Sequence, residues 1–94
     1  MTTVTVRIPT PLRAYTRGAD EVHAQGATVA EALHTLGTAC DGLLAQVLTP
    51  EGEPRQFVNI YLGSRNVRAL HGMDTPVNDG DVISIVPAVA GGAV

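Results

Sequence analysis

Hydrophobic and polar residues alternate at the start of the chain. Residues 4–8 read Val-Thr-Val-Arg-Ile, and this period of two predicts a half-buried strand. Two prolines then interrupt the pattern, so residues 9–18 are expected to form a broad hairpin loop. A second strand is predicted over residues 19–24, with Val22 facing inward.

Helical spacing begins after residue 27. Thr28 and Glu31 fit a capping box, in which the side chain of each residue satisfies a backbone donor of the other. The apolar residues that follow are spaced by four, three and four positions, which places them on one face of a helix. They are Val29, Leu33, Leu36 and Cys40. The Asp-Gly pair at 41–42 is expected to end this helix before a short helical turn over residues 43–48.

Two further apolar runs lie in the second half of the chain. Residues 57–62 predict a strand, and Gly-Ser at 63–64 is expected to turn the chain back onto Val67. The last run, residues 82–86, is apolar on both faces, which is typical of a central strand. A loop is expected at residues 49–54, and turns at 73–77 and 78–81.

These elements follow the order strand, strand, helix, strand, short strand, strand. That order predicts an α+β fold of the β-grasp (ubiquitin-like) kind, with one main helix packed across a mixed sheet. A chain of 94 residues forms one domain, which we expect over residues 1–87. Because 45% of the residues are hydrophobic and only 3% are aromatic, the core is expected to consist of Val, Leu, Ile and Ala.

Charge and hydropathy argue against several classes of partner. The formal net charge is −3 without a block of like charges, so we expect no nucleic-acid partner. No apolar stretch approaches the roughly 20 residues that span a bilayer, so we expect no membrane contact. The first residues lack the basic start and the apolar stretch of a signal peptide, which favours a cytoplasmic location.

Few side chains could carry chemistry. Cys40 is the only cysteine and has no activating base nearby in the sequence, which favours a buried, inert thiol over a catalytic one. His23, His34 and His71 share no metal-ligand spacing, so we expect surface positions and no metal site. No acid–base pair, nucleophile–histidine arrangement or phosphate loop is visible, so no enzyme activity is predicted.

The chain ends in small residues. Residues 88–94 read Ala-Val-Ala-Gly-Gly-Ala-Val, a tail that cannot pack a core and that we expect to be disordered. Such a tail can enter a narrow channel in which any Cβ atom would collide with the walls. The glycine pair alone is equally compatible with a frayed chain end.

The last strand and the tail together give a more specific indication of function than the glycine pair alone. Residues 79–92 read Asp-Gly-Asp-Val-Ile-Ser-Ile-Val-Pro-Ala-Val-Ala-Gly-Gly, which resembles the ending of the MoaD/ThiS ubiquitin-like sulfur carriers. Phe-Val-Asn-Ile-Tyr-Leu at 57–62 resembles the middle strand of that family. The likeness extends over nearly the whole chain, is weakest over residues 41–55, and is nearest to the actinobacterial carriers of cysteine biosynthesis.

The resemblance implies that Gly92 is the working terminus, presented on a stalk of Val89, Ala90 and Gly91. In this sequence Ala93 and Val94 follow, and a glycine in an amide bond has no free carboxylate. We therefore hypothesise a precursor that is cleaved between Gly92 and Ala93, by resemblance by a zinc-dependent JAMM-type peptidase. The alternative is that the two extra residues disable the tail.

The family chemistry then follows as an expectation. An E1-like enzyme uses ATP and Mg²⁺ to adenylate the glycine, and a sulfur donor displaces AMP to leave a thiocarboxylate. In cysteine biosynthesis that group attacks an activated serine derivative on a pyridoxal phosphate enzyme. The chain itself is expected to bind no cofactor.

A docking patch on the domain is expected from the same motifs. It contains Leu70 and Val86, with Pro9 and Arg13 near its edge. The alternatives are core packing for Leu70 and Val86, and a solvated loop position for Arg13.

Two other readings stay open. Thiamin, molybdopterin, thiolated tRNA and sulfur-containing natural products are made with carriers of this shape, and the fold does not choose among them. A ubiquitin-like modifier that forms isopeptide bonds with target lysines would use the same activated glycine.

Overall fold

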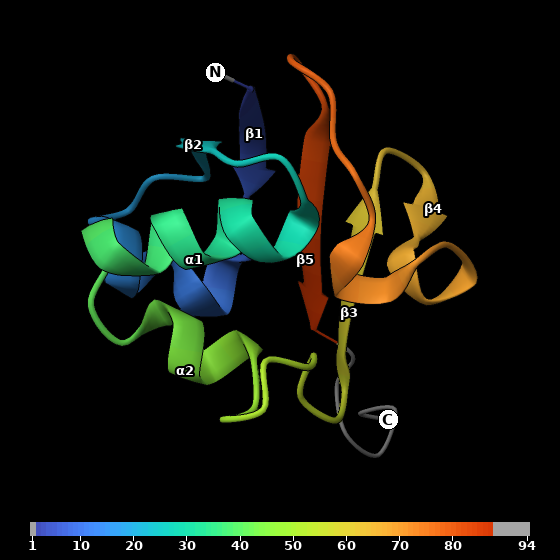
Figure 1. Cartoon of the computed structure of the whole chain (residues 1–94). Coiled ribbons are helices and arrows are strands. Elements are labelled where there is room, and N and C mark those ends of the chain that lie inside the picture. The colour runs from blue at the N-terminus through green and yellow to red at the C-terminus, as the bar shows by residue number, and fades with distance from the viewer. Residues whose placement is uncertain (1, 88–94) are drawn as a thin grey trace.

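A mixed five-stranded sheet with one long helix across it forms the fold (Figure 1). The computed structural model describes residues 2–87. The strands are β1 (Thr3–Arg7), β2 (Glu21–Gln25), β3 (Val58–Leu62), β4 (Arg65–Asn66) and β5 (Val82–Pro87). The α-helices are α1 (Val29–Ala39) and α2 (Leu43–Val47), and short 3-10 helices are η1 (Thr10–Thr16), η2 (Val67–Ala69) and η3 (Gly72–Asp74). The predicted α+β class, with a mixed sheet and one main helix, is confirmed.

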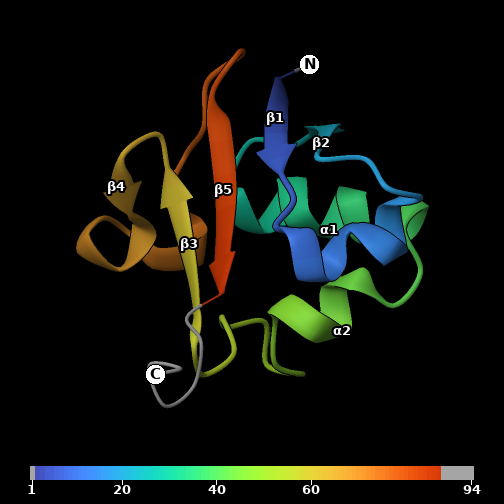
Figure 2. The same ribbon diagram turned by 180° about the vertical axis from the view of Figure 1, so that it is seen from behind.

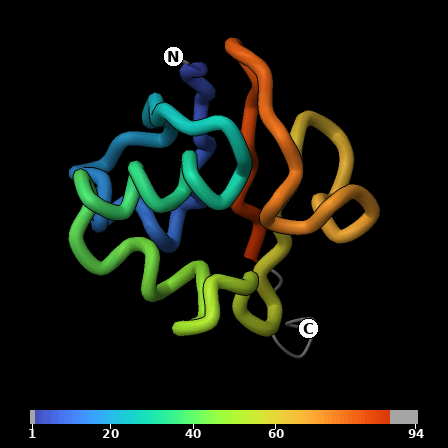
Figure 3. The backbone as a smooth tube through the Cα atoms, in the orientation of Figure 1, coloured from blue at the N-terminus to red at the C-terminus, as the bar shows by residue number. Residues whose placement is uncertain are grey.

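The last strand lies in the middle of the sheet, as its apolar sequence predicts. The strand order is β2-β1-β5-β3-β4, with β1 and β5 parallel and the other pairs antiparallel. Because β1 and β5 run in the same direction, β5 ends at the end of the molecule opposite the N-terminus (Figure 3). The segment between α2 and β3 passes along that same end of the molecule (Figures 1 and 3).

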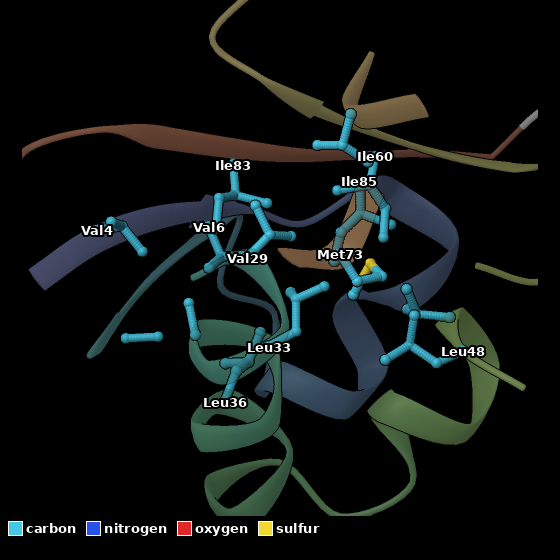
Figure 4. Close-up of a cluster of buried hydrophobic side chains, with 14 of the residues drawn as sticks. Val4, Val6, Val29, Leu33, Leu36, Leu48, Ile60, Met73, Ile83 and Ile85 are labelled. Atoms are coloured by element: carbon cyan, nitrogen blue, oxygen red, sulfur yellow. The ribbon is translucent and has the colours of Figure 1, made fainter. Parts of the chain in front are cut away.

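The core fills the space between α1 and one face of the sheet (Figure 4). Alternate residues of the strands point into it, because successive side chains of a strand point to opposite faces. Helix α1 contributes the face that the sequence spacing predicts, although its last predicted member, Cys40, is the C-cap and is only half-buried. Fully buried aliphatic side chains at the centre include Val4, Val6, Val29, Leu33, Ile60 and Ile83.

The start of α1 has both hydrogen bonds of a capping box, one of them shifted by a residue. The Glu31 N–H donates to Oγ1 of Thr28 at 3.2 Å, as predicted. The Glu31 carboxylate accepts from the N–H of Ala27 at 2.9 Å rather than from that of Thr28. The Glu31 carboxylate therefore also holds the backbone of Ala27, the residue before the N-cap.

The segment predicted as a broad loop after β1 contains η1. Proline in the first turn of a helix is tolerated because the N–H that it lacks has no partner within the helix. Pro9 is the N-cap and Pro11 lies in the first turn, so the two prolines start η1 instead of preventing it. The second strand is also shifted, to begin at Glu21, and the half-buried Val22 packs against the core as predicted.

Candidate docking surface at the end of β5

The functional tail predicted from the sequence begins where β5 ends. Pro87, the last residue of β5, pairs with Val58 of the antiparallel strand β3. Residues 88–94 lie outside the described residues, and with them the predicted stalk, the activated terminus and the cleavage site. These are Val89, Ala90 and Gly91, then Gly92, and the Gly92–Ala93 bond.

A groove lies beside the last residues of β5. Pairing of β1 with β5 stops at Arg7 and Ser84, whereas β5 continues to Pro87 (Figure 2). The chain after β1 turns away into η1, so among residues 2–87 no strand lies beside the last three residues of β5 on this side. The opening is a groove of about 290 Å³, lined by Arg7, Ile8, Pro9, Arg13, Ser84, Ile85 and Val86. Three of the four residues expected at a docking patch therefore come together.

Val86 faces away from the core. Its neighbour Ile85 is 3% exposed, whereas Val86 is 42% exposed. Across the sheet Val86 pairs with Asn59 of β3, on the face that α1 does not cover. Core packing, the alternative reading of this residue, is therefore wrong.

Arg13 is held in place by the fold. Its Nε–H donates to the carbonyl oxygen of Ile8 at 3.0 Å, and the residue is half-buried rather than a freely solvated loop position. A guanidinium has five N–H donors, and within residues 2–87 the terminal nitrogens of Arg13 make no hydrogen bond.

Arg7 gives the groove a second positive charge. Its Nε lies 3.7 Å from a carboxylate oxygen of Glu21, and both side chains are more than half exposed. An exposed ion pair of this kind is weak and is readily exchanged for another partner.

Leu70 lies away from the groove. It follows η2 and donates its N–H to the carbonyl of Val67 at 2.9 Å. This segment comes after β4, which is two strands away from β5 in the sheet. Leu70 is half-buried. Because it lies beyond β4, a contact of this residue with a partner would be separate from the groove.

Phe57 is an exposed residue that the sequence pattern does not single out. The pattern places it in the third strand, but β3 begins one residue later, at Val58. Phe57 is 50% exposed and has φ of 68°, the left-handed region that L residues with a large side chain rarely adopt. No local sequence signal marks such a conformation at a phenylalanine.

The other candidate residues form no site together. His23, His34 and His71 are exposed, as predicted, on β2, on α1 and before η3. Within residues 2–87 no group of three or more His, Cys, Asp or Glu side chains could hold a metal ion. No helix in this part of the chain is long and apolar enough to cross a bilayer.

Comparison with known proteins gives consistent results. Residues 6–92 match the ThiS family. The chain is 41% identical over 91 residues to the sulfur carrier protein CysO of Mycobacterium tuberculosis, covering 95% of this chain and 98% of that protein. A chain in the crystal structure of the Amycolatopsis orientalis BexX/CysO complex is 42% identical, with a TM-score of 0.88 over 95% of this chain and 99% of that one. The solution structure of small archaeal modifier protein 1 from Methanosarcina acetivorans is 28% identical, with a TM-score of 0.84 over 98% of both chains. These likenesses confirm the ubiquitin-like β-grasp fold.

Proposed function

Because the chain belongs to the ThiS family of sulfur carriers, we propose that its Gly92, exposed by removal of Ala93 and Val94, becomes a thiocarboxylate that donates sulfide in biosynthesis. A member of this family is a carrier and not an enzyme. The observation that carries the proposal is the extent of the family match, which continues through the glycine pair and stops at residue 92. The two residues beyond it are the ones that removal would take away.

Removal has to come first, for a chemical reason. The amide bond to Ala93 leaves Gly92 without a carboxylate, and its hydrolysis, which we assign to a zinc-dependent JAMM-type peptidase, supplies one. An α-carboxylate has a pKa of about 3.5 and is anionic at neutral pH, so it is a poor electrophile. Activation is therefore needed before sulfur can be attached.

An E1-like enzyme with ATP and Mg²⁺ supplies that activation. A carboxylate oxygen of Gly92 attacks the α-phosphorus of ATP and pyrophosphate leaves, which forms an acyl adenylate. Hydrosulfide from a sulfide donor then attacks the acyl carbon and AMP leaves, and loss of the S–H proton gives the thiocarboxylate. Both the nucleotide and the metal belong to the partner, and the carrier binds no cofactor of its own.

The folded domain contributes binding free energy. Ordering about five tail residues costs on the order of 5–10 kcal/mol of backbone entropy. Main-chain hydrogen bonds in a channel offset part of this cost, in the manner of strand addition. At ~25 cal/mol per Å², a contact of ~300 Å² gives roughly 7 kcal/mol before association costs. The groove beside Pro9, Arg13 and Val86 supports this role because it lies where the tail begins.

Leu70 is proposed as a separate contact. Leu70 is half-buried and lies beyond β4. A partner that contacted both Leu70 and the groove would therefore have to extend over the strands that lie between them. Leu70→Asp should weaken the complex with the E1-like enzyme. An unchanged affinity would mean that Leu70 is not part of the docking surface.

For the acceptor we propose cysteine biosynthesis through a pyridoxal phosphate enzyme, in the cytoplasm. The identity of 41% with CysO over nearly the whole chain supports this choice. A sulfur-containing natural product is the second candidate acceptor, because the fold of a carrier does not choose its acceptor.

A modifier function is the alternative from another class. The likeness to small archaeal modifier protein 1 supports it, because the same activated glycine could form isopeptide bonds with lysines. Conjugates of higher mass in extracts of the source cells would favour the modifier, whereas their absence beside a thiocarboxylated carrier would favour sulfur transfer.

Intact-protein mass spectrometry tests the proposal. The chain ending at Gly92 is incubated with the E1-like enzyme of the source organism, ATP, Mg²⁺ and a sulfide donor. We expect a mass increase equal to the exchange of one oxygen for sulfur, and no change for the chain ending at Val94. An unaltered mass of the shorter chain, with an enzyme that is active on another carrier, would refute the function. Finding only the longer chain in the source cells would contradict trimming.

A further inference from the structure

The backbone conformation of Phe57 has a local cause. The N–H of Val58 donates to the carbonyl of Arg55 at 3.0 Å, which closes a four-residue turn. Phe57 is the third residue of this turn and has φ of 68°, whereas Gln56 is not among the residues with positive φ. This combination is that of a type II turn, whose third position favours Gly or Asn. Phenylalanine is therefore an unfavourable residue for the conformation that it adopts.

Packing within the domain does not explain why a phenylalanine stands there. Its side chain is 50% exposed, the largest exposed fraction among the large hydrophobic residues of the described chain. Arg17, the other non-glycine residue with positive φ in residues 2–87, caps the end of η1, where a left-handed conformation is common. Phe57 caps no helix, and a glycine would suit its turn better.

Phe57 lies at the root of the tail. It directly precedes Val58, which pairs with Pro87, the last residue of β5. The groove with Pro9 and Arg13 lies on the opposite side of β5. Strand β5 therefore ends between an exposed aromatic residue on the β3 side and a groove with two arginines on the β1 side.

From this arrangement we infer that Phe57 is an apolar anchor for the E1-like enzyme, which receives it in a pocket next to an acidic side chain. The inference rests on the proposed function, because that enzyme must surround the tail at the point where it leaves the domain. The acidic side chain follows from charge complementarity, since Arg7 and Arg13 line the groove. Buried aromatic residues flanked by polar contacts are the usual sites of high binding energy in interfaces.

The proposal predicts opposite effects of one substitution on stability and on binding. Phe57→Gly relieves the turn and should leave the melting temperature unchanged or higher. The dissociation constant for the E1-like enzyme should rise at least about tenfold, because the anchor is lost. Phe57→Leu, which keeps an apolar side chain at the same position, should recover part of the affinity. Arg17→Gly is the matched control, since it changes the other left-handed residue without touching the groove, and it should bind as the wild type does.

Calorimetric titration of the chain ending at Gly92 into the E1-like enzyme of the source organism measures these constants. The described core residues all lie between Val4 and Ile85, so shortening the chain at Gly92 removes none of them. A second titration at raised salt should weaken wild-type binding, and Arg7→Gln together with Arg13→Gln should reduce that salt dependence.

Each outcome distinguishes failure of the anchor from failure of the proposed function. If the wild type neither binds the enzyme nor gains sulfur, the proposed function fails. If the wild type is thiocarboxylated and Phe57→Gly binds equally well, the anchor is refuted while the carrier function stands. A clear fall in the melting temperature of Phe57→Gly would also overturn the inference, because Phe57 would then serve the fold.

Discussion

Gly26 offers a direct test of how closely α1 approaches the sheet. It follows β2, donates its N–H to the carbonyl of Thr2 at 3.1 Å, and its φ is not in the left-handed region. A Cβ atom at this position would lie 2.5 Å from the backbone nitrogen of Ala32 and 2.8 Å from the carbonyl carbon of Glu31. Both are backbone atoms of the first turn of α1, so no side-chain rotation relieves the contact. We expect Gly26→Ala to push the helix away from β2.

The size of the effect follows from two opposing contributions. Overpacking of a well-packed site costs about 1–3 kcal/mol. Replacing glycine by alanine restricts the unfolded chain and returns about 0.4–1 kcal/mol. The free energy of unfolding should therefore fall by about 1–2 kcal/mol. In a domain of this size each kcal/mol corresponds to about 4–8 °C, so the melting temperature should fall by about 5–15 °C.

Gly37→Ala is the matched control. Gly37 also lacks positive φ, but the three atoms nearest to a Cβ atom there would be side-chain atoms of Leu44, at 3.0 to 3.4 Å. Alanine is favoured over glycine inside a helix by about 1 kcal/mol, which offsets the displacement of Leu44. Thermal unfolding followed by circular dichroism should show a shift of only a few degrees for Gly37→Ala. Equal melting temperatures of Gly26→Ala and the wild type would refute the close approach of α1 to residue 26.

Three further predictions concern the helix cap, the core and the tail. Thr28→Ala removes the acceptor for the Glu31 N–H and should lower the free energy of unfolding in urea by about 1 kcal/mol, and an unchanged midpoint would contradict the cap. Leu33 is 1% exposed, so Leu33→Ala should cost about 2–5 kcal/mol in the same assay, whereas a loss below that range would mean that the core closes over the cavity. Gly92→Leu should abolish thiocarboxylate formation in the mass assay without changing the melting temperature, and a loss of the fold would instead make the tail structural.

The elements that bury one face could be predicted from the sequence. The spacing of Val29, Leu33 and Leu36 reports the side of α1 that contacts the sheet, because burial imposes the helical period on the sequence. The alternation over residues 4–8 and the apolar run over residues 82–86 report the strands in the same way. Each pattern reflects the burial of one face of its own segment. It can therefore be recognised without knowing which element packs against that face.

The features that no local pattern predicts depend on contacts between distant segments or on single backbone angles. The groove exists because β1 leaves β5 after Arg7, and the register of two strands more than seventy residues apart in the chain is not written in either strand. The prolines that start η1 have the same sequence signature as prolines in a loop. At the left-handed position of the turn a phenylalanine stands in place of the glycine that would have marked it. Phe57 belongs to an apolar run, and the pattern of that run predicts a strand.

The position of β5 gives a physical reason for the division of work between domain and tail. A partner that draws the tail into a channel pulls on the strand from which the tail leaves. An edge strand would be held by one neighbour, whereas β5 pairs with β1 at three positions and with β3 at five. Its inward side chains Ile83 and Ile85 are also buried, so separating the strand would expose the centre of the core. Free energy gained from contacts between a partner and the domain would therefore offset the cost of ordering the tail, because the alternative response, loss of β5 from the sheet, costs much of the stability of the domain.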